Sequence, residues 1–420
     1  MAPSLTGDDR SESVSAANGA TLAAVCSCNK CLPQTREDPI VLADQNFVVR
    51  PLPTIAFSRG SSQQLSNHIQ SLGKTAALIV TDKNLAASGV LDPVLDALRA
   101  ANLAVEVFDG VEPNPTDKNV EAGAERLRAL GDACVIPIGG GSSMDCGKSV
   151  ALLAANGGTV QDLQTGTPVN ATAPVIAVPT TAGTGSETNS ACVITNTALG
   201  RKTYVMHPSI TPAFAVLDPD LTVGLPTYPT ATCGFDVLTH AVEAFVSAGQ
   251  SAYSDTIALE AITKVANNLR RVVTDGSDIE ARSEMLLGSA MAAIAFNVAG
   301  LGSAHGTGHA VSARLNAAHG QTLATMLPHV MEHNMSERAD KYAEVARILA
   351  PSGPATGAGA IDAVVRLRSD IGIDKSIRDL GGEDGLLPVL VEDALADPVN
   401  FSNPVPADAA AFETMYQAAW

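Results

Sequence analysis

The chain has 420 residues, of which 46% are hydrophobic, and its formal net charge at pH 7 is -18. The hydrophobic content predicts a folded globular protein, and the length is sufficient for two domains. The negative charge disfavours a nucleic-acid or anionic-membrane partner, because such partners attract positively charged surfaces. Seven cysteines in a chain of this length disfavour a disulfide scaffold and favour a reducing, cytoplasmic location.

The first 44 residues differ in composition from the rest of the chain. Residues 1–44 are polar, rich in Ser and Ala and mixed in charge, which predicts a disordered leader. They contain no basic start followed by an apolar run, so no secretory signal is predicted. Cys26, Cys28 and Cys31 lie close together in this segment. They could form a thiolate metal clip, but without a second Cys/His pair nearby an incidental cluster is the simpler interpretation.

Apolar runs alternate with segments of helical spacing from about residue 47 onward. Near-continuous apolar strands between helices predict a parallel sheet that is covered on both faces. The runs 133–148 and 173–187 each predict a strand, a glycine-rich loop and then a helix. The other expected elements before them are strands at 76–82 and 104–110 and helices at 92–103 and 119–131.

The pattern changes after residue 222, where strand signals end. We therefore predict an α/β domain over residues 45–222 and a helical domain over residues 223–420. Long helices are expected at 230–249, 253–273 and 280–299, and helical patterns continue from 338 to the end. The uncharged stretch 285–304 has the length of a membrane span, but its Gly, Ser and Asn residues favour a buried helix.

Two glycine-rich loops are candidates for cofactor binding. "IGGGSSMD" at 138–145 places glycines between a strand and a helix, where backbone N–H groups and the helix N-terminus can bind a pyrophosphate. "PTTAGTGSE" at 179–187 is a second loop of small and hydroxyl-bearing residues. Each alone could be an ordinary tight turn, but two such loops at neighbouring strand ends favour a dinucleotide cleft.

Asp82 ends an early predicted strand and has two possible roles. In doubly wound folds an acid at this position can accept a hydrogen bond from a ribose 2′-hydroxyl and repel a 2′-phosphate. The other role is the N-cap of the following helix. If Asp82 faces a ribose, NAD is preferred over NADP.

Five residues of the helical half have the types and spacing of a metal site. Asp236 and His240 are four residues apart, as are His305 and His309, so each pair lies on one helix face. His319 follows a short loop of small residues, and an aspartate with three imidazoles suits Fe²⁺ or Zn²⁺. The alternative is a set of separate core or surface histidines. The remaining histidines lack such spacing and are expected to be structural or on the surface: His68, His207, His329 and His333.

Taken together, these motifs resemble the iron-containing, group III alcohol dehydrogenases. Six segments carry the resemblance, in the family's order and spacing, and it extends from about residue 46 to the C-terminus. The segments are "TD" at 81–82, "PNPT" at 113–116, "GGGSSMD" at 139–145, "TTAGTGSE" at 180–187, "GFDVLTHAVEA" at 234–244 and "GLGSAHGTGHAVSARLNAAHG" at 300–320.

The resemblance implies a fold and a set of site residues. The fold is a Rossmann-like α/β domain followed by an all-α domain, as in the dehydroquinate synthase-like enzymes, with the active site in the cleft between them. The metal ligands are implied to be Asp236, His240, His305 and His319, with His309 beside the nicotinamide as a proton relay. The implied NAD contacts are Asp82, Asn114, Gly140, Gly141, Ser142, Asp145, Thr180, Thr181, Thr184 and Lys202. A homodimer or larger homo-oligomer is also implied.

The expected function is hydride transfer between a primary alcohol, or its aldehyde, and NAD(H). The metal acts as a Lewis acid on the alcohol oxygen, and the proton leaves through His309 or water. The glycines around the histidines are expected to let backbone and cofactor approach closely. Ala318, Cys233 and Gly147 depart from the family's usual residues, which leaves the pocket shape and the substrate open. Fe²⁺ and Zn²⁺ both suit the ligand types.

Several other functions remain as alternatives. A hydroxyacid-oxoacid transhydrogenase or a maleylacetate reductase belongs to the same superfamily, and the former would hold NAD tightly. A lyase of the dehydroquinate-synthase type needs a basic cluster, and only Arg314 lies near the predicted site in the sequence. A metal hydrolase would not need the two glycine-rich loops. A non-catalytic NAD-binding protein would not need a complete metal site.

Overall fold

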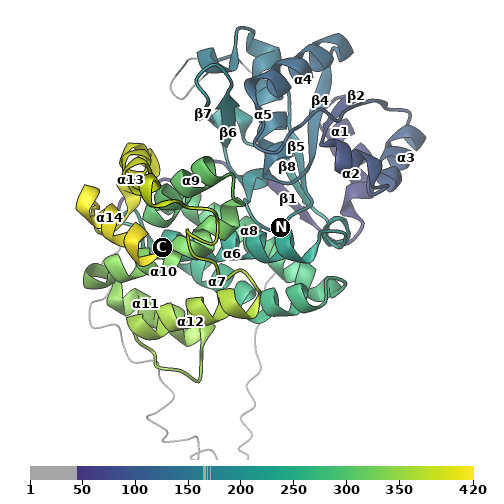
Figure 1. Ribbon diagram of the computed structural model, residues 1–420. Coiled ribbons are helices and arrows are strands. Elements are labelled where there is room, and N and C mark those ends of the chain that lie inside the picture. Colours follow the sequence, from purple (N-terminus) through teal and green to yellow (C-terminus); the bar gives the residue numbers. More distant parts are fainter. Residues whose placement is uncertain (1–44, 164–166, 168, 171) are drawn as a thin grey trace, which may run out of the picture. The chain divides into compact units, whose positions relative to one another are not determined.

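Six short strands pair in parallel into one sheet, in the order β1-β8-β5-β4-β2-β3 (Figure 1). This computed structural model describes residues 45–163, 167, 169–170 and 172–420, so the predicted leader with Cys26, Cys28 and Cys31 lies outside the described residues. The strands are β1 (Thr54–Phe57), β2 (Ala76–Val80), β3 (Ala104–Phe108), β4 (Ala133–Gly139), β5 (Ile176–Pro179) and β8 (Phe214–Leu217).

Helices cover both faces of this sheet, as the apolar strands predict. Side chains alternate along a strand, so Leu78 and Val80 of β2 pack with α4 and α5, whereas Ala77 and Ile79 pack with α1 and α3. All four of these β2 residues are fully buried. The surrounding helices are α1 (Leu65–Ser71), α2 (Lys83–Ala87), α3 (Asp92–Ala100), α4 (Asp117–Leu130) and α5 (Gly141–Asn156).

The helix predicted after the second glycine-rich loop is wrong. Ser186–Thr188 form a single 3-10 turn, and the chain then enters an antiparallel hairpin of β6 (Ala191–Asn196) and β7 (Arg201–Met206). Gly185 adopts a left-handed φ of +61°, and any Cβ there would collide with Ala293. The loop therefore turns against α8 at this point, and the alternating burial of β6 is the pattern of a strand rather than a helix.

A helical region follows the sheet and builds the largest apolar core of the described residues. Its first helix starts three residues earlier than predicted, because Pro226 at the N-cap and Pro229 in the first turn need no N–H partner there. Asp44–Trp420 form one compact unit. The helices are α6 (Thr227–Val246), α7 (Ala252–Thr274), α8 (Ile279–Ala299), α9 (Ser303–Leu315), α10 (His319–His333), α11 (Met335–Leu349), α12 (Gly357–Asp370), α13 (Leu387–Ala396) and α14 (Ala409–Ala418), with a 3-10 segment η8 (Pro398–Ser402) between the last two.

The long uncharged stretch 285–304 lies in α8 and the start of α9. Within the described residues, no single helix combines the length and hydropathy of a membrane span. The pair α8 and α9 meets those criteria only when joined, and it bends by 111° between the two helices. Leu286, Ala290 and Ala293 of α8 are fully buried inside the fold, as the prediction of a buried helix requires.

Candidate active site

The two glycine-rich loops and Asp82 follow three strands that lie side by side in the sheet. Along the chain, β3 pairs with one side of β2 and β4 with the other. The carboxyl ends of β2 and β4 therefore flank the switch point at which α/β sheets bind ligands. A Cβ built on Gly140 would lie 3.4 Å from Thr181, and one on Gly141 would lie 2.7 Å from Thr184. The two predicted cofactor loops therefore contact each other.

Asp82 forms the N-cap of α2, which was one of its two predicted roles. Its Oδ1 accepts hydrogen bonds from the backbone N–H groups of Asn84 at 2.9 Å and Leu85 at 3.0 Å. Its other oxygen, Oδ2, is not used by this cap. The predicted contact with a ribose hydroxyl remains compatible with the cap and stays a prediction.

Asp145 joins the first loop to the second loop and the hairpin. Its Oδ1 accepts a hydrogen bond from the Ser186 hydroxyl at 2.6 Å, and its Oδ2 accepts one from the Val193 N–H at 2.9 Å. The fully buried ammonium of Lys148 donates to the carbonyls of Ser186 and Ala191. Both carboxylate oxygens of Asp145 thus hold the loop, and its predicted direct contact with NAD stays a prediction.

The remaining predicted cofactor residues lie around these loops. Asn114 adopts a left-handed φ of +55° in the turn before α4, and Ser142 lies in the first turn of α5. Thr180 is buried at the end of β5, whereas Lys202 is exposed on β7. The structure therefore brings the predicted residues to the carboxyl edge of the sheet and to the adjoining hairpin.

Glu187 in the second loop gives a pH-dependent prediction. Burial raises its pKa from 4.5 to about 7, and its Oε1 has no hydrogen-bond partner among the described residues. Between these pH values the folded chain keeps a proton that the unfolded chain releases. The free energy of unfolding is therefore unaffected by Glu187 below pH 4.5, falls as the pH rises from 4.5 to 7, and stays lowered above pH 7. Glu187→Gln should therefore raise the free energy of unfolding at pH 8.5 by up to about 3 kcal/mol.

Urea unfolding at pH 5.5 and pH 8.5 measures this effect. The gain should be about 1 kcal/mol at pH 5.5 and about 3 kcal/mol at pH 8.5. Glu280→Gln at the start of α8 serves as a control that should change the free energy of unfolding at neither pH. An equal effect of Glu187→Gln at both pH values would contradict a buried, protonated Glu187.

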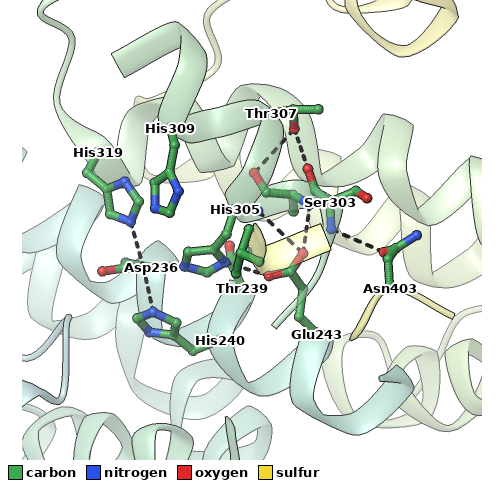
Figure 2. Close-up of polar contacts among 12 residues, drawn as sticks. Asp236, Thr239, His240, Glu243, Ser303, His305, Thr307, His309, His319 and Asn403 are labelled. Carbon is green, nitrogen blue, oxygen red and sulfur yellow. Dashed lines mark hydrogen bonds and ion pairs between the residues drawn. The ribbon is translucent and has the colours of Figure 1, made fainter. Parts of the chain in front are cut away.

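The predicted metal ligands converge from three helices. The Nε2 atoms of His240, His305 and His319 lie 3.4, 3.6 and 3.7 Å from Oδ1 of Asp236 (Figure 2). Ligand atoms of Asp236, His305 and His319 all lie within 4.8 Å of one another. The i, i+4 spacing on α6 accounts for Asp236 and His240, whereas the other two residues arrive from α9 and from the first position of α10.

Helix packing brings His319 to this cluster. Gly320 follows it directly, and any Cβ there would overlap the carbonyl of Thr232 on α6. Only glycine lets the start of α10 pack this closely against α6. The glycine after the last predicted ligand therefore has a structural reason.

The donor set fits a divalent cation. Separations of 3.4 to 3.7 Å exceed the roughly 2.7–3.2 Å of N–H···O hydrogen bonds. Atoms that each lie about 2.0–2.1 Å from one tetrahedral ion are about 3.4 Å apart. Oδ1 of Asp236 and Nε2 of His305 are buried and have no hydrogen-bond partner among the described residues. A metal ion bound between these two atoms would satisfy both of them.

The protonation of His240 and His319 agrees with this fit. Burial lowers the pKa of His240 to about 4 and that of His319 well below its ordinary range. Burial alone would raise the pKa of Asp236, but the facing imidazoles of His240 and His319 hold it below its ordinary value. Neutral imidazoles beside an ionised carboxylate offer the lone pairs that a cation needs.

Glu243 supports the cluster and was missed in the sequence. Its Oε2 lies 2.5 Å from Nδ1 of His305, and its Oε1 accepts a hydrogen bond from the Ala304 N–H at 2.7 Å. Burial opposes protonation of His305, while the Glu243 and Asp236 carboxylates raise its pKa to about 9. Glu243 thus keeps a proton on Nδ1 and turns Nε2 toward Asp236, where a bound cation would displace the second proton of His305. Its signal was the i+3 spacing from His240, which places it on the same face of α6.

His309 lies beside the cluster but does not converge on Asp236. Its ring stacks on that of His319 with centroids 5.3 Å apart, and its Nδ1 lies 2.7 Å from Oδ2 of Asp397 (Figure 2 shows the two imidazoles). The side chains of His319 and His309 are 32% and 24% exposed, whereas those of Asp236 and His305 are at most 4% exposed. The cluster therefore opens to solvent on the side of His309 and His319.

The glycines near the histidines let other parts of the chain pack closely, as predicted, and their predicted approach to the cofactor stays a prediction. Side chains built on Gly300, Gly302 and Gly306 would collide with Ser402, Asn403 and Asn400 respectively. These glycines therefore let residues 400–403 pack closely against the start of α9 and the loop before it. Gly147 is also explained, because a Cβ there would lie 2.7 Å from Pro137 of β4.

Comparison with known proteins decides the family. Residues 53–219 match the model of the iron-containing alcohol dehydrogenase family, and residues 230–420 match the model of the C-terminal part of the Fe-containing alcohol dehydrogenase family. The chain belongs to the iron-containing alcohol dehydrogenase family. The predicted family, the α/β plus all-α fold class and the enzyme class, an alcohol dehydrogenase, are confirmed.

Its relatives within this family are named after different alcohol substrates. The chain is 38% identical over 358 residues to the 1,3-propanediol dehydrogenase of Klebsiella pneumoniae, an alignment that covers 83% of this chain and 92% of that protein. It is 36% identical over 365 residues to the NAD-dependent methanol dehydrogenase of Bacillus methanolicus, covering 86% and 95%. The solved structure of a 1,3-propanediol oxidoreductase superposes with a TM-score of 0.86 at 36% identity, covering 90% of this chain and 100% of that one.

Proposed function

We propose that this protein transfers a hydride between a primary alcohol, or its aldehyde, and NAD(H) at a metal site in the helical region. The observation that carries the proposal is the convergence of three imidazole Nε2 atoms on Oδ1 of Asp236, 3.4 to 3.7 Å away. This cluster opens beside His309, so a small substrate can reach it from that side.

The residues that would hold the two cofactors are those predicted from the sequence. Asp236, His240, His305 and His319 would hold Fe²⁺, with Zn²⁺ as the other ion that the ligand types suit. Residues 45–222 would bind NAD along the two glycine-rich loops, and residues 223–420 would supply the metal ligands. When bound, the cation supplies Lewis-acid chemistry and NAD⁺ supplies the hydride acceptor.

His309 would accept the proton that the alcohol loses. Nδ1 of His309 is held by Asp397, which leaves Nε2 to accept the hydroxyl proton of the alcohol and pass it to solvent. Aldehyde reduction uses the same atoms in reverse.

The proposal is tested by NAD⁺ reduction with anaerobically purified, Fe²⁺-reconstituted protein. The substrate panel is short primary alcohols, diols and 2- or 4-hydroxy acids, each with a chelator control. We expect chelator-sensitive NADH formation with one class of alcohol. Absence of NADH with every substrate would contradict the proposal and favour a transhydrogenase that keeps its NAD bound.

Asp82 is predicted to select NAD over NADP. Asp82→Ser removes the charge but keeps a side-chain oxygen that can cap α2. Because a 2′-phosphate would no longer face a carboxylate, kcat/KM with NADP⁺ should rise by about 10-fold or more. Asp92→Ser, at the start of α3, is the control and should not change the ratio of kcat/KM with NADP⁺ to kcat/KM with NAD⁺. An unchanged NADP⁺ to NAD⁺ ratio in Asp82→Ser would show that Asp82 is only a cap.

The assembly is proposed from the resemblance, and the location from the cysteine content. We expect a homodimer or larger homo-oligomer in the cytoplasm. Light scattering on the purified full chain measures the mass of the assembly, and a monomer of 42.9 kDa would contradict the expectation.

A further inference from the structure

Asp397 approaches His309 from a segment 88 residues further along the chain. Its Oδ2 lies 2.7 Å from Nδ1 of His309, and its Oδ1 accepts a hydrogen bond from the Val399 N–H at 3.0 Å. Its side chain is only 10% exposed. The carboxylate is therefore fixed on both sides and cannot turn away without breaking the N-cap of η8.

The segment that carries Asp397 is itself packed on α9. Nδ2 of Asn400 donates hydrogen bonds to the carbonyls of Ala394 at 2.7 Å and Asp397 at 3.0 Å. The other end of the Asn400 amide lies against Gly306, where no side chain intervenes. This packing sets the distance between Asp397 and α9, on which His309 lies.

Tyr204 reaches the same pair from the β6–β7 hairpin. Its hydroxyl lies 3.5 Å from Nδ1 of His309, and the Asp397 carboxylate is near enough to affect its pKa. Burial and the Asp397 carboxylate both raise the pKa of Tyr204, so the hydroxyl stays protonated. Burial opposes ionisation of Asp397, but the contact with His309 lowers its pKa below the ordinary value. An ionised Asp397 can only accept hydrogen bonds.

We propose that Asp397, supported by Tyr204, is the positioning residue for proton transfer in this enzyme. Asp397 accepts the Nδ1–H of His309 and thereby fixes the tautomer in which Nε2 carries the lone pair. In alcohol oxidation the O–H bond breaks and its proton goes to Nε2, while the hydride leaves carbon for NAD⁺. The resulting imidazolium is stabilised by Asp397 until the proton passes to solvent. This inference rests on the proposed function of His309.

A second aspartate, Asp393, allows a purely structural role of Asp397 to be tested. Asp393 on α13 also connects the C-terminal region to α9, since its two oxygens accept hydrogen bonds from Arg314 at 2.6 and 2.8 Å. Asp393 does not contact His309. Asp393→Asn therefore removes a similar anchor to α9 without changing the tautomer, and it serves as the matched control for Asp397→Asn.

The experiment uses ¹⁵N NMR to measure which ring nitrogen of His309 carries the proton. The full chain, labelled with ¹⁵N-histidine and loaded with Zn²⁺ to avoid paramagnetic broadening, is compared with Asp397→Asn, Asp397→Glu and Asp393→Asn. The His309 signals are assigned by their loss in His309→Gln. Steady-state kinetics and metal content are measured for the same variants loaded with Fe²⁺.

We expect His309 to carry its proton on Nδ1 in the parent and on Nε2 in Asp397→Asn. The amide oxygen of the variant would keep the Val399 N–H, so its amide nitrogen would donate to Nδ1. In that variant kcat should fall by about 100-fold, with KM and metal content nearly unchanged. Asp397→Glu should restore the parent tautomer and part of kcat, and Asp393→Asn should resemble the parent.

Two results would overturn the inference: retention of the Nδ1 proton in Asp397→Asn, or a loss in kcat of less than about threefold. If the parent itself oxidises no alcohol, the proposed function fails. The ring-nitrogen signals still decide whether Asp397 sets the tautomer.

Discussion

His319→Ala should abolish metal retention and NADH formation together. His319 supplies one of three imidazole nitrogens that face Oδ1 of Asp236, and it lies on the open side of the cluster. Loss of one of four ligands leaves an incomplete site, and the Lewis acid contributes several kcal/mol to the reaction. The expected fall in kcat/KM is therefore about 10³-fold or more.

Metal content by mass spectrometry and initial rates in one preparation measure this effect. The matched control is His329→Ala, because His329 is a partly buried histidine on the same helix α10 but lies outside the cluster. The control should keep both metal and activity. A His319→Ala protein that retains a full equivalent of metal and its turnover would remove His319 from the ligand set.

Glu243→Gln should weaken metal binding by about 10- to 100-fold without removing any ligand. Gln retains an oxygen that can accept the Ala304 N–H, but its amide nitrogen would donate toward Nδ1 of His305. The imidazole would then carry its proton on Nε2, the atom that faces Asp236. The folded protein would be left with one ligand in the wrong tautomer.

Competition with a chelator of known affinity measures the dissociation constant of the metal in each variant. Circular dichroism of the metal-free proteins verifies that Glu243→Gln is folded, since Glu243 also anchors the start of α9. Glu284→Gln is the control, because this carboxylate pairs with Lys264 on the surface of the same helical region. Equal metal affinity in the parent and Glu243→Gln would show that Glu243 serves the fold alone.

Local spacing was sufficient to predict part of the metal site. Asp236 and His240 share a face of α6 because they are four residues apart, and His305 and His309 share a face of α9 for the same reason. Spacing alone does not separate His305, which faces Asp236, from His309, which contacts Asp397. That difference comes from the packing of α9 against α6 and η8, and only the family resemblance assigned the two roles in advance.

Residues that act through tertiary contacts were missed. Asp397 lies 88 residues after His309, in a segment with no regular spacing to any histidine, and Tyr204 is on a hairpin that was not predicted. The hairpin was missed because the loop 179–187 resembles the first glycine-rich loop in composition. The contact of Gly185 with α8, which turns the chain there, is invisible in the local sequence.

The most direct test of the metal site is a crystal structure of the full chain with Fe²⁺ and NAD⁺, measured on both sides of the iron absorption edge. We predict one strong anomalous peak per chain, within bonding distance of Asp236, His240, His305 and His319, with His309 unligated and in contact with Asp397. A peak at other residues, or no peak in crystals of protein that retains iron and activity, would contradict the site described above.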